Sequence, residues 1–125
     1  MIFGVGTDIV AVARMAEYWQ RHGERGLEKM LAADEREACR SSLDPARFLA
    51  KRFAAKEALG KALGTGVRAP VLLPEMSIHH DELGKPGFAF GPALADYLAQ
   101  RGLSAHLSIS DEKDYAVAFV IMERA

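Results

Sequence analysis

Residues Arg47 to Gly66 read RFLAKRFAAKEALGKALGTG, and the rest of the chain is expected to pack around this segment. Its Ala, Leu, Lys, Arg and Glu residues are strong helix formers, and Pro45 stands where the first turn of a helix tolerates it. Phe and Leu recur at helical spacing, so one face of the predicted helix is expected to be buried. Gly64-Thr65-Gly66 predicts its end, because Gly readily takes the left-handed conformation at a helix C-terminus.

Five residues of this segment lie along one stripe of the predicted helix: Phe53, Glu57, Gly60, Lys61 and Gly64. Glu57 four residues before Lys61 is the favourable order for an ordinary surface ion pair, worth about 0.2–0.5 kcal/mol. Gly60 disfavours a helix by about 1 kcal/mol relative to Ala, which indicates that another group approaches closely there. The stripe therefore has two interpretations, a surface pair or a carboxylate and a lysine at a binding site.

The composition predicts one globular domain spanning residues 1–125, since 50% of the chain is hydrophobic. Lys and Arg number 16 against 17 Asp and Glu, for a formal net charge of -1. This balance indicates neither a nucleic acid nor an anionic membrane as partner. An anionic ligand must instead be bound by a local cluster, such as Lys51, Arg52 and Lys56.

Three features predict a cytoplasmic location. The single Cys39 excludes an internal disulfide and is typical of a reducing compartment. No apolar run is long enough to span a bilayer. The first residues, Met1 to Gly4, lack the basic lead of a signal peptide.

A short apolar strand is predicted over residues 2–10, and Asp8 interrupts its apolar run. Asp8 either caps the helix that follows or is held at the strand end to bind a cation. The helix predicted over residues 11–22 carries Arg14 and Arg21 away from its apolar side. These arginines either form a solvated face or are a docking patch for an acidic protein.

The other segments predict an α+β domain with a mainly antiparallel sheet. Asp34 is expected to cap a helical segment, with Glu37 completing a capping box. The expected helices cover residues 27–40 and 91–101, and the expected strands cover residues 75–80, 88–90, 105–110 and 115–122.

Three blocks of the sequence together resemble the holo-[acyl-carrier-protein] synthase family, the small phosphopantetheinyl transferases. The blocks are GVGTDIV at residues 4–10, RFLAKRFAAKEALGKA at 47–62 and HLSISD at 106–111. The resemblance covers nearly the whole chain. It implies the 4'-phosphopantetheinyl transferase fold, in which the sheet packs against the long central helix.

The resemblance also implies an activity, a metal and an assembly. The activity is Mg²⁺-dependent transfer of the 4'-phosphopantetheine arm of coenzyme A to a serine of apo acyl carrier protein, in fatty acid biosynthesis. The second product is adenosine 3',5'-bisphosphate. The implied assembly is a homotrimer with its sites between subunits, in which Arg47, Lys51 and Arg52 serve a neighbour's cofactor.

Individual roles follow from the same resemblance. Asp8 and Glu57 resemble the family's magnesium ligands, and Lys61 resembles the lysine beside the pyrophosphate. Arg14 and Arg21 resemble part of the surface that meets the acidic helix of the carrier. Many relatives have His where this chain has Asp111, so no role of that His is transferred.

The chemistry of these residue types agrees with that assignment, because Mg²⁺ is held by one or two carboxylates together with phosphate oxygens and water. The loop Gly64, Thr65 and Gly66 is expected to let backbone approach the cofactor. Arg52 and His106 are candidates for binding the nucleotide, although His106 is equally interpreted as an ordinary sheet residue. The attacking serine belongs to the carrier, so only a base is needed.

Three points stay open from the sequence. The base is a water on the metal, Glu57 or Lys61 with a lowered pKa. A non-catalytic module that binds coenzyme A or a carrier protein is a second hypothesis, and a metal-dependent phosphohydrolase is a third. The hydrolase predicts coenzyme A breakdown without any carrier, and the pure binder gives no reason for both Asp8 and Glu57.

Overall fold

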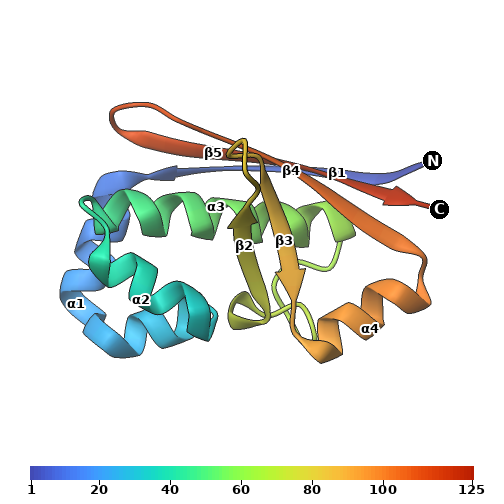
Figure 1. Cartoon of the computed structure of the whole chain (residues 1–125), viewed down its shortest axis with the longest axis horizontal. Coiled ribbons are helices and arrows are strands. Elements are labelled where there is room, and N and C mark those ends of the chain that lie inside the picture. The colour runs from blue at the N-terminus through green and yellow to red at the C-terminus, as the bar shows by residue number, and fades with distance from the viewer.

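A three-stranded antiparallel sheet and one long helix form the centre of the fold (Figure 1). The computed structural model describes all 125 residues. Strands β1 (Ile2–Ala11), β5 (Tyr115–Arg124) and β4 (Leu103–Asp111) lie side by side in that order. Helix α3 (Pro45–Leu63) packs along one face of this sheet, as the sequence predicted for the central helix.

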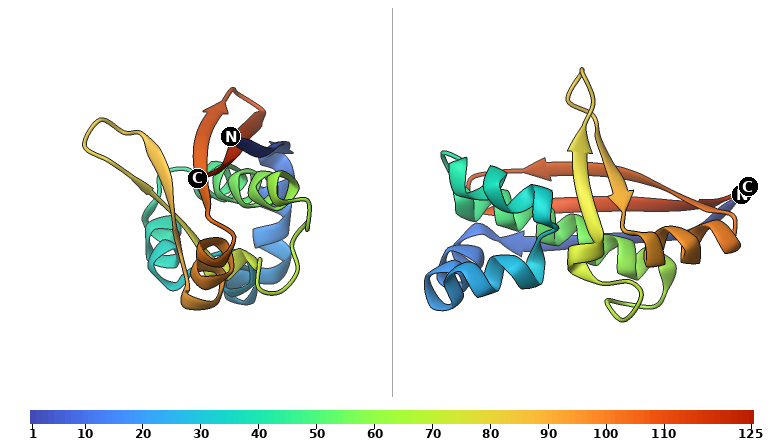
Figure 2. Two further views of the ribbon diagram at one scale, coloured as in Figure 1. Left: turned by 90° about the vertical axis from the view of Figure 1, so that its right-hand side faces the viewer. Right: turned by 60° about the horizontal axis from the view of Figure 1, so that its bottom comes forward.

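The other elements surround α3 and complete the predicted α+β domain. They are α1 (Val12–Met30), α2 (Ala33–Ser41), a short 3-10 helix (Leu73–Glu75), β2 (Met76–His80), β3 (Pro86–Phe90) and α4 (Pro92–Gln100). Strands β2 and β3 form a separate antiparallel hairpin, whose turn projects beyond the rest of the molecule (Figure 2). None of the helices is long and apolar enough to cross a membrane.

Small residues let α3 and β1 approach each other closely. Ala58 and Ala62 are buried on the side of α3 that meets the sheet. A Cβ added to Gly4 or Gly6 of β1 would collide with the carbonyl oxygens of Ala62 and Ala58. The glycines of the first sequence block are therefore needed for helix–sheet packing, and this packing fixes where Asp8 lies.

The helix ends agree with the sequence prediction in one place and differ in another. The predicted break at Gly23 is confirmed: its φ of 56° and ψ of -140° are not helical, so α1 is two helical segments that meet at a kink there, and the second continues to Met30. The predicted cap at Asp34 is wrong, because α2 begins after Ala32, whose N–H donates to the Glu35 carboxylate at 3.0 Å. Asp34 instead accepts a hydrogen bond from Ser77 at 3.0 Å, which ties α2 to β2.

The outer face of the three-stranded sheet is uncovered. All four helices lie on the opposite side (Figures 1 and 2). Val5, Ile9, Tyr115 and Phe119 remain exposed on the outer face, with 61% of Ile9 and 43% of Phe119 accessible. Successive residues of a strand point to opposite faces, so Gly6, Asp8 and Val10 cannot contribute to this surface.

Candidate active site

Asp8 and Lys61 meet across the contact between β1 and α3. Asp8 lies on the helix-facing side of β1, between the buried Gly6 and Val10. The Lys61 ammonium donates to Asp8 Oδ1 at 3.0 Å and to the backbone oxygen of Thr7 at 2.9 Å. Two residues that lie 53 positions apart in the sequence therefore form an ion pair at the surface.

Both ordinary interpretations of these residues are wrong. Asp8 does not cap α1, whose N-cap is Ala11 with no side-chain cap. Lys61 pairs with Asp8 and forms no ion pair with Glu57, so the spacing of four residues does not mark a surface pair. The carboxylates and the lysine therefore form a cluster from two separate elements.

Glu57 belongs to the same electrostatic cluster. Partial burial raises the pKa of Glu57, and the negative charge of Asp8 raises it further. Lys61 and Arg14 oppose this shift, so their positive charges also lie near the carboxyl group. Arg14 stands over the Phe53 ring, 5.4 Å from its centroid, which places its guanidinium beside α3.

The residues present fit a magnesium ion. Asp8 exposes 17% of its side chain and Glu57 is half-buried, so both carboxylates reach solvent from the edge of the core. Mg²⁺ is usually bound by one or two protein carboxylates, with substrate phosphates and water filling the other positions. No group of three or more His, Cys, Asp or Glu is placed to hold a metal, so a closed cage of protein ligands is not present.

Substituting Asp8 with Asn is expected to lower the pKa of Glu57 in the metal-free protein. The substitution removes the neighbouring negative charge, so the ionised form of Glu57 becomes easier to reach and its proton leaves at lower pH. The carboxyl ¹³C shift of Glu57, followed by NMR against pH, measures the change. Asp34→Asn, on α2, is the control that should leave this titration as it was. An unchanged titration in Asp8→Asn would mean that the two carboxylates are too far apart to share a cation.

The glycine loop after α3 folds back onto the helix. Gly64 and Gly66 have φ of 81° and 67°, and the Gly66 N–H donates to Gly60 O at 3.1 Å. A Cβ on Gly60 would lie 3.0 Å from the carbonyl carbon of Gly66. The close approach predicted at Gly60 is therefore made by this loop itself. Thr65 donates its hydroxyl hydrogen to Gly66 O at 2.8 Å.

Arg52 and His106 are not brought to Asp8 within one chain. Arg52 donates to Glu35 at 2.8 Å and to Ile78 O at 2.6 Å, and only 13% of its side chain is exposed. His106 lies on the outer face of the sheet, where its Nε2 is 2.9 Å from Glu123. Asp8 faces the other way, toward α3.

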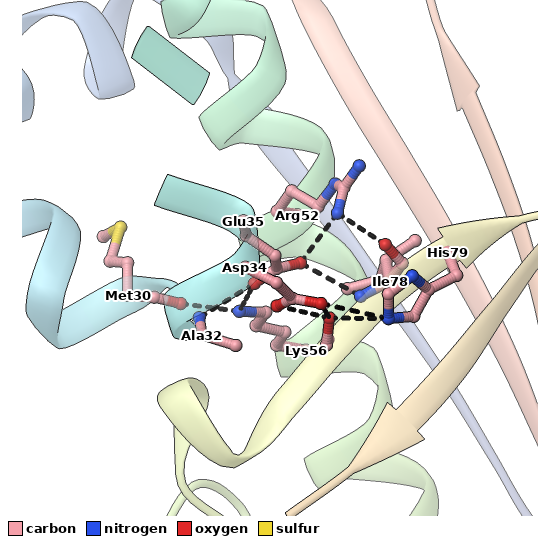
Figure 3. Close-up of polar contacts among 9 residues, drawn as sticks. Met30, Ala32, Asp34, Glu35, Arg52, Lys56, Ile78 and His79 are labelled. Atoms are coloured by element: carbon pink, nitrogen blue, oxygen red, sulfur yellow. Dashed lines mark hydrogen bonds and ion pairs between the residues drawn. The ribbon is translucent and has the colours of Figure 1, made fainter. Parts of the chain in front are cut away.

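A buried network around Glu35 was missed from the sequence (Figure 3). Its carboxylate accepts from Lys56 at 2.6 Å and Arg52 at 2.8 Å, and from the N–H groups of Ala32 and Ile78 at 3.0 Å each. These partners lower the pKa of Glu35 although burial opposes its charge. The Glu35 network thus joins α2, α3 and β2.

Lys56 is the fully buried cation of this network. It also donates to Met30 O at 2.7 Å, and burial lowers its pKa to about 8. Two of the three residues predicted to make a local positive field, Arg52 and Lys56, are therefore paired with Glu35, whereas Lys51 stays partly exposed. The signal was present, since Lys56 lies midway between the buried Leu49 and Leu63 on one helical stripe.

A cavity of about 460 Å³ opens beside the N-terminal half of α3. Its charged lining includes Arg47, Lys51, Arg52 and Asp111, and His80 of the β2–β3 hairpin also faces it. It is separate from the Asp8–Lys61 pair, since neither of these residues lines it.

The first helix presents a basic surface, as predicted. Arg21, Arg25 and Lys29 line one hollow of about 580 Å³ together with Tyr18 and His22. Arg21 pairs only with Glu17 of its own helix, at 3.3 Å, and 69% of its side chain is exposed. Its charge is therefore available to a partner.

The fold and the site define an α+β domain in which two carboxylates and a lysine lie near the glycine loop that follows α3. A sequence model described as the 4'-phosphopantetheinyl transferase superfamily matches residues 4–120. The chain belongs to the holo-[acyl-carrier-protein] synthase family of this superfamily, so the resemblance drawn from the three sequence blocks is confirmed.

The relatives match over their whole length. The holo-[acyl-carrier-protein] synthase of Azoarcus sp. (strain BH72) is 59% identical over 98% of both chains, and that of Dechloromonas aromatica (strain RCB) is 57% identical over 100% of both. The crystal structure of the Neisseria meningitidis synthase superposes with a TM-score of 0.96 at 43% identity, covering 99% of this chain and 100% of that one. The synthase of Bacillus anthracis, solved in complex with CoA (3',5'-ADP), gives a TM-score of 0.83 at 32% identity, covering 100% and 99%.

Proposed function

We propose that this protein transfers the 4'-phosphopantetheine group of coenzyme A to a serine of apo acyl carrier protein, releasing adenosine 3',5'-bisphosphate. The observation that carries the proposal is that Asp8, Glu57 and Lys61 cluster in a chain 57–59% identical, over its full length, to proteins named holo-[acyl-carrier-protein] synthase. We assign the reaction to one domain spanning residues 1–125, acting in fatty acid biosynthesis in the cytoplasm.

The test is the release of adenosine 3',5'-bisphosphate, followed by chromatography. We expect release only when coenzyme A and an apo carrier protein are both present. Release at the same rate without carrier would favour a phosphohydrolase and contradict the proposal.

In this account Asp8 and Glu57 hold Mg²⁺, which when bound neutralises the charge of the pyrophosphate under attack. Lys61 orients Asp8 through the 3.0 Å ion pair and places an ammonium group for a phosphate oxygen. The loop Gly64–Gly66 follows the last turn of α3, which contains Lys61, and offers backbone to the same ligand. Glu57, whose pKa is raised, and Lys61 are both candidates to take the proton of the carrier serine.

Arg14 and Arg21 are assigned to carrier docking on α1. Arg14 also lies near Glu57, so reversing its charge would disturb the metal site as well. Arg21 is the cleaner position, because its only ion pair is with Glu17 at the surface.

Arg21→Glu is expected to raise the Michaelis constant for the carrier roughly tenfold and to leave that for coenzyme A unchanged, since a reversed charge repels an acidic surface. Steady-state kinetics with each substrate varied in turn measures both constants. The matched control is Arg101→Glu, after α4, which makes the same charge change away from α1. Equal effects on both substrates, or an equal effect in the control, would remove Arg21 from the docking surface.

We further propose that the protein is a homotrimer with its sites between subunits. The uncovered apolar face of the sheet supports this, because contiguous exposed apolar surface commonly marks an interaction site. His106 lies on that same face, so it is positioned to serve a neighbouring subunit rather than its own Asp8. Arg52 is assigned to the nucleotide, at the cavity that it lines.

Phe119→Glu is expected to convert trimers to monomers and to abolish transfer, because it places a charge in the centre of the outer sheet face. Sedimentation velocity and the transfer assay measure the two effects. Leu83→Glu is the control that should leave the trimer and its activity unchanged, because Leu83 lies in the turn of the β2–β3 hairpin and is 95% exposed. A fully active monomer would contradict the shared site.

A further inference from the structure

Asp111 forms ion pairs with two of the cations that line the cavity beside α3. Its Oδ2 lies 3.1 Å from Arg47 Nη1, and its Oδ1 lies 3.5 Å from Lys51 Nζ. One carboxylate at the end of β4 thus bridges two basic residues that lie one helical turn apart on α3.

Most other positive charge in the cavity is already engaged. Arg52 is held by Glu35 and Ile78 O, and Arg47 also donates to Asp44 at 3.2 Å and to the carbonyls of residues 112 and 113 at 2.7 Å each. Lys51 is different, because its only ion pair is with Asp111 and 39% of its side chain is exposed. It is the cation most available to an incoming anion.

Asp111 sets the charge of this cavity. The lining holds three cations (Arg47, Lys51 and Arg52) and two carboxylates (Asp44 and Asp111), which gives 3 - 2 = +1. His80 adds no charge at neutral pH, since burial and the charges of Arg52 and Lys51 lower its pKa. Neutralising Asp111 alone would raise the net charge to +2 and free Lys51.

We propose that the Asp111 carboxylate competes with a ligand phosphate for Lys51 and Arg47, and so weakens binding of coenzyme A. The choice of coenzyme A rests on the proposed function, whereas the competition itself rests only on the cavity. An entering phosphate must displace Asp111 from Lys51 and then lie beside a like charge, and both effects reduce its affinity. The affinity of the cavity for anions is thus adjusted by one side chain outside the Asp8–Lys61 pair.

The test compares Asp111→Asn with Glu112→Gln. Both substitutions remove one negative charge at adjacent positions, but the exposed Glu112 side chain forms no ion pair and does not line the cavity. We expect Asp111→Asn to bind inorganic pyrophosphate, without metal, about fivefold more tightly than the unchanged protein, as for loss of one partly exposed charge pair. Glu112→Gln should bind as the unchanged protein does. Coenzyme A should show the same order of affinities.

Two further variants locate the effect. Asp111→Glu retains the charge and should show no gain, and adding Lys51→Met to Asp111→Asn should remove most of the gain. Melting temperatures establish that each variant is folded before its binding is compared. Equal gains in pyrophosphate affinity for Asp111→Asn and Glu112→Gln would indicate a general effect of net charge. Unchanged or weaker binding in folded Asp111→Asn would show that the carboxylate does not compete with the ligand. Either result overturns the inference.

The pyrophosphate measurement separates this inference from the proposed function. A gain for pyrophosphate without any carrier modification by the unchanged protein would support the role of Asp111 and contradict the transferase. Carrier modification by the unchanged protein, without a gain in pyrophosphate affinity for Asp111→Asn, would support the transferase and contradict the role of Asp111.

Discussion

Glu57→Gln is expected to lower the rate of carrier modification by at least about 100-fold. Loss of a residue that only hydrogen-bonds to a metal ligand costs about 10- to 100-fold, and Glu57 is proposed to be a ligand itself. Glutamine keeps the size of the side chain but carries no negative charge, so Asp8 would hold the cation alone. Burial and the negative charge of Asp8 raise the pKa of Glu57, so its ionised form is disfavoured in the folded protein. Stability should therefore be maintained or slightly increased.

Initial rates at saturating coenzyme A and carrier, measured over a range of Mg²⁺ concentrations, test this expectation. The matched control is Glu82→Gln in the exposed β2–β3 turn, which should stay within about twofold of the unchanged protein, as most surface substitutions do. Near-normal rates in folded Glu57→Gln, at ordinary Mg²⁺, would remove Glu57 from the site.

Glu35→Gln is expected to lower the free energy of unfolding by about 3–5 kcal/mol, the cost of removing one partner of a buried ion pair. The substitution leaves the buried Lys56 ammonium without a counter-charge, and Arg52 loses its ion pair (Figure 3). The pKa of Lys56 is already lowered to about 8 by burial, and without Glu35 it should fall further.

Urea unfolding at neutral pH measures the change. Glu37→Gln on the same helix is the control. Glu37 is exposed and contacts only Arg40 and Ser41 of its own helix, so its loss should cost no more than about 0.5 kcal/mol. Combining Glu35→Gln with Lys56→Met should recover part of the loss, since the fully buried ammonium of Lys56 is then removed together with its counter-charge. Strictly additive effects would show that Glu35 and Lys56 act independently and would contradict the network.

The centre of the fold could be predicted from the sequence because its signals are local. The helix-forming residues after Pro45 and the glycines after Leu63 define α3, which begins and ends close to the predicted positions. The two-residue alternation of the last segment likewise predicts β5. These features depend on neighbouring residues and on backbone conformation alone.

The cluster of Asp8 and Lys61 was predicted from family resemblance rather than from periodicity. Spacing alone does not decide whether Asp8 is a helix cap or a cation ligand, because sequence spacing contains no information on which strand lies against α3. The contact depends on Gly4 and Gly6, which let β1 approach the helix. A resemblance supplies such long-range information indirectly.

The Glu35 network could not be assembled from the sequence, because Glu35 and Lys56 lie 21 positions apart and both residue types are usually exposed. Asp34 gives the commoner cap signal, but in the structure the Glu35 carboxylate accepts a hydrogen bond from the Ala32 N–H. For His106 the strand was predicted correctly, but the face on which it lies depends on which residues of β4 meet the core.

The measurement that tests the central proposal most directly is the intact mass of a purified apo acyl carrier protein after incubation with this protein, coenzyme A and Mg²⁺. We predict that the carrier gains the mass of one phosphopantetheine group, and that a chelator prevents the gain. An unchanged mass with several carrier proteins, while coenzyme A still binds, would contradict the transferase and favour a module that only binds its ligand.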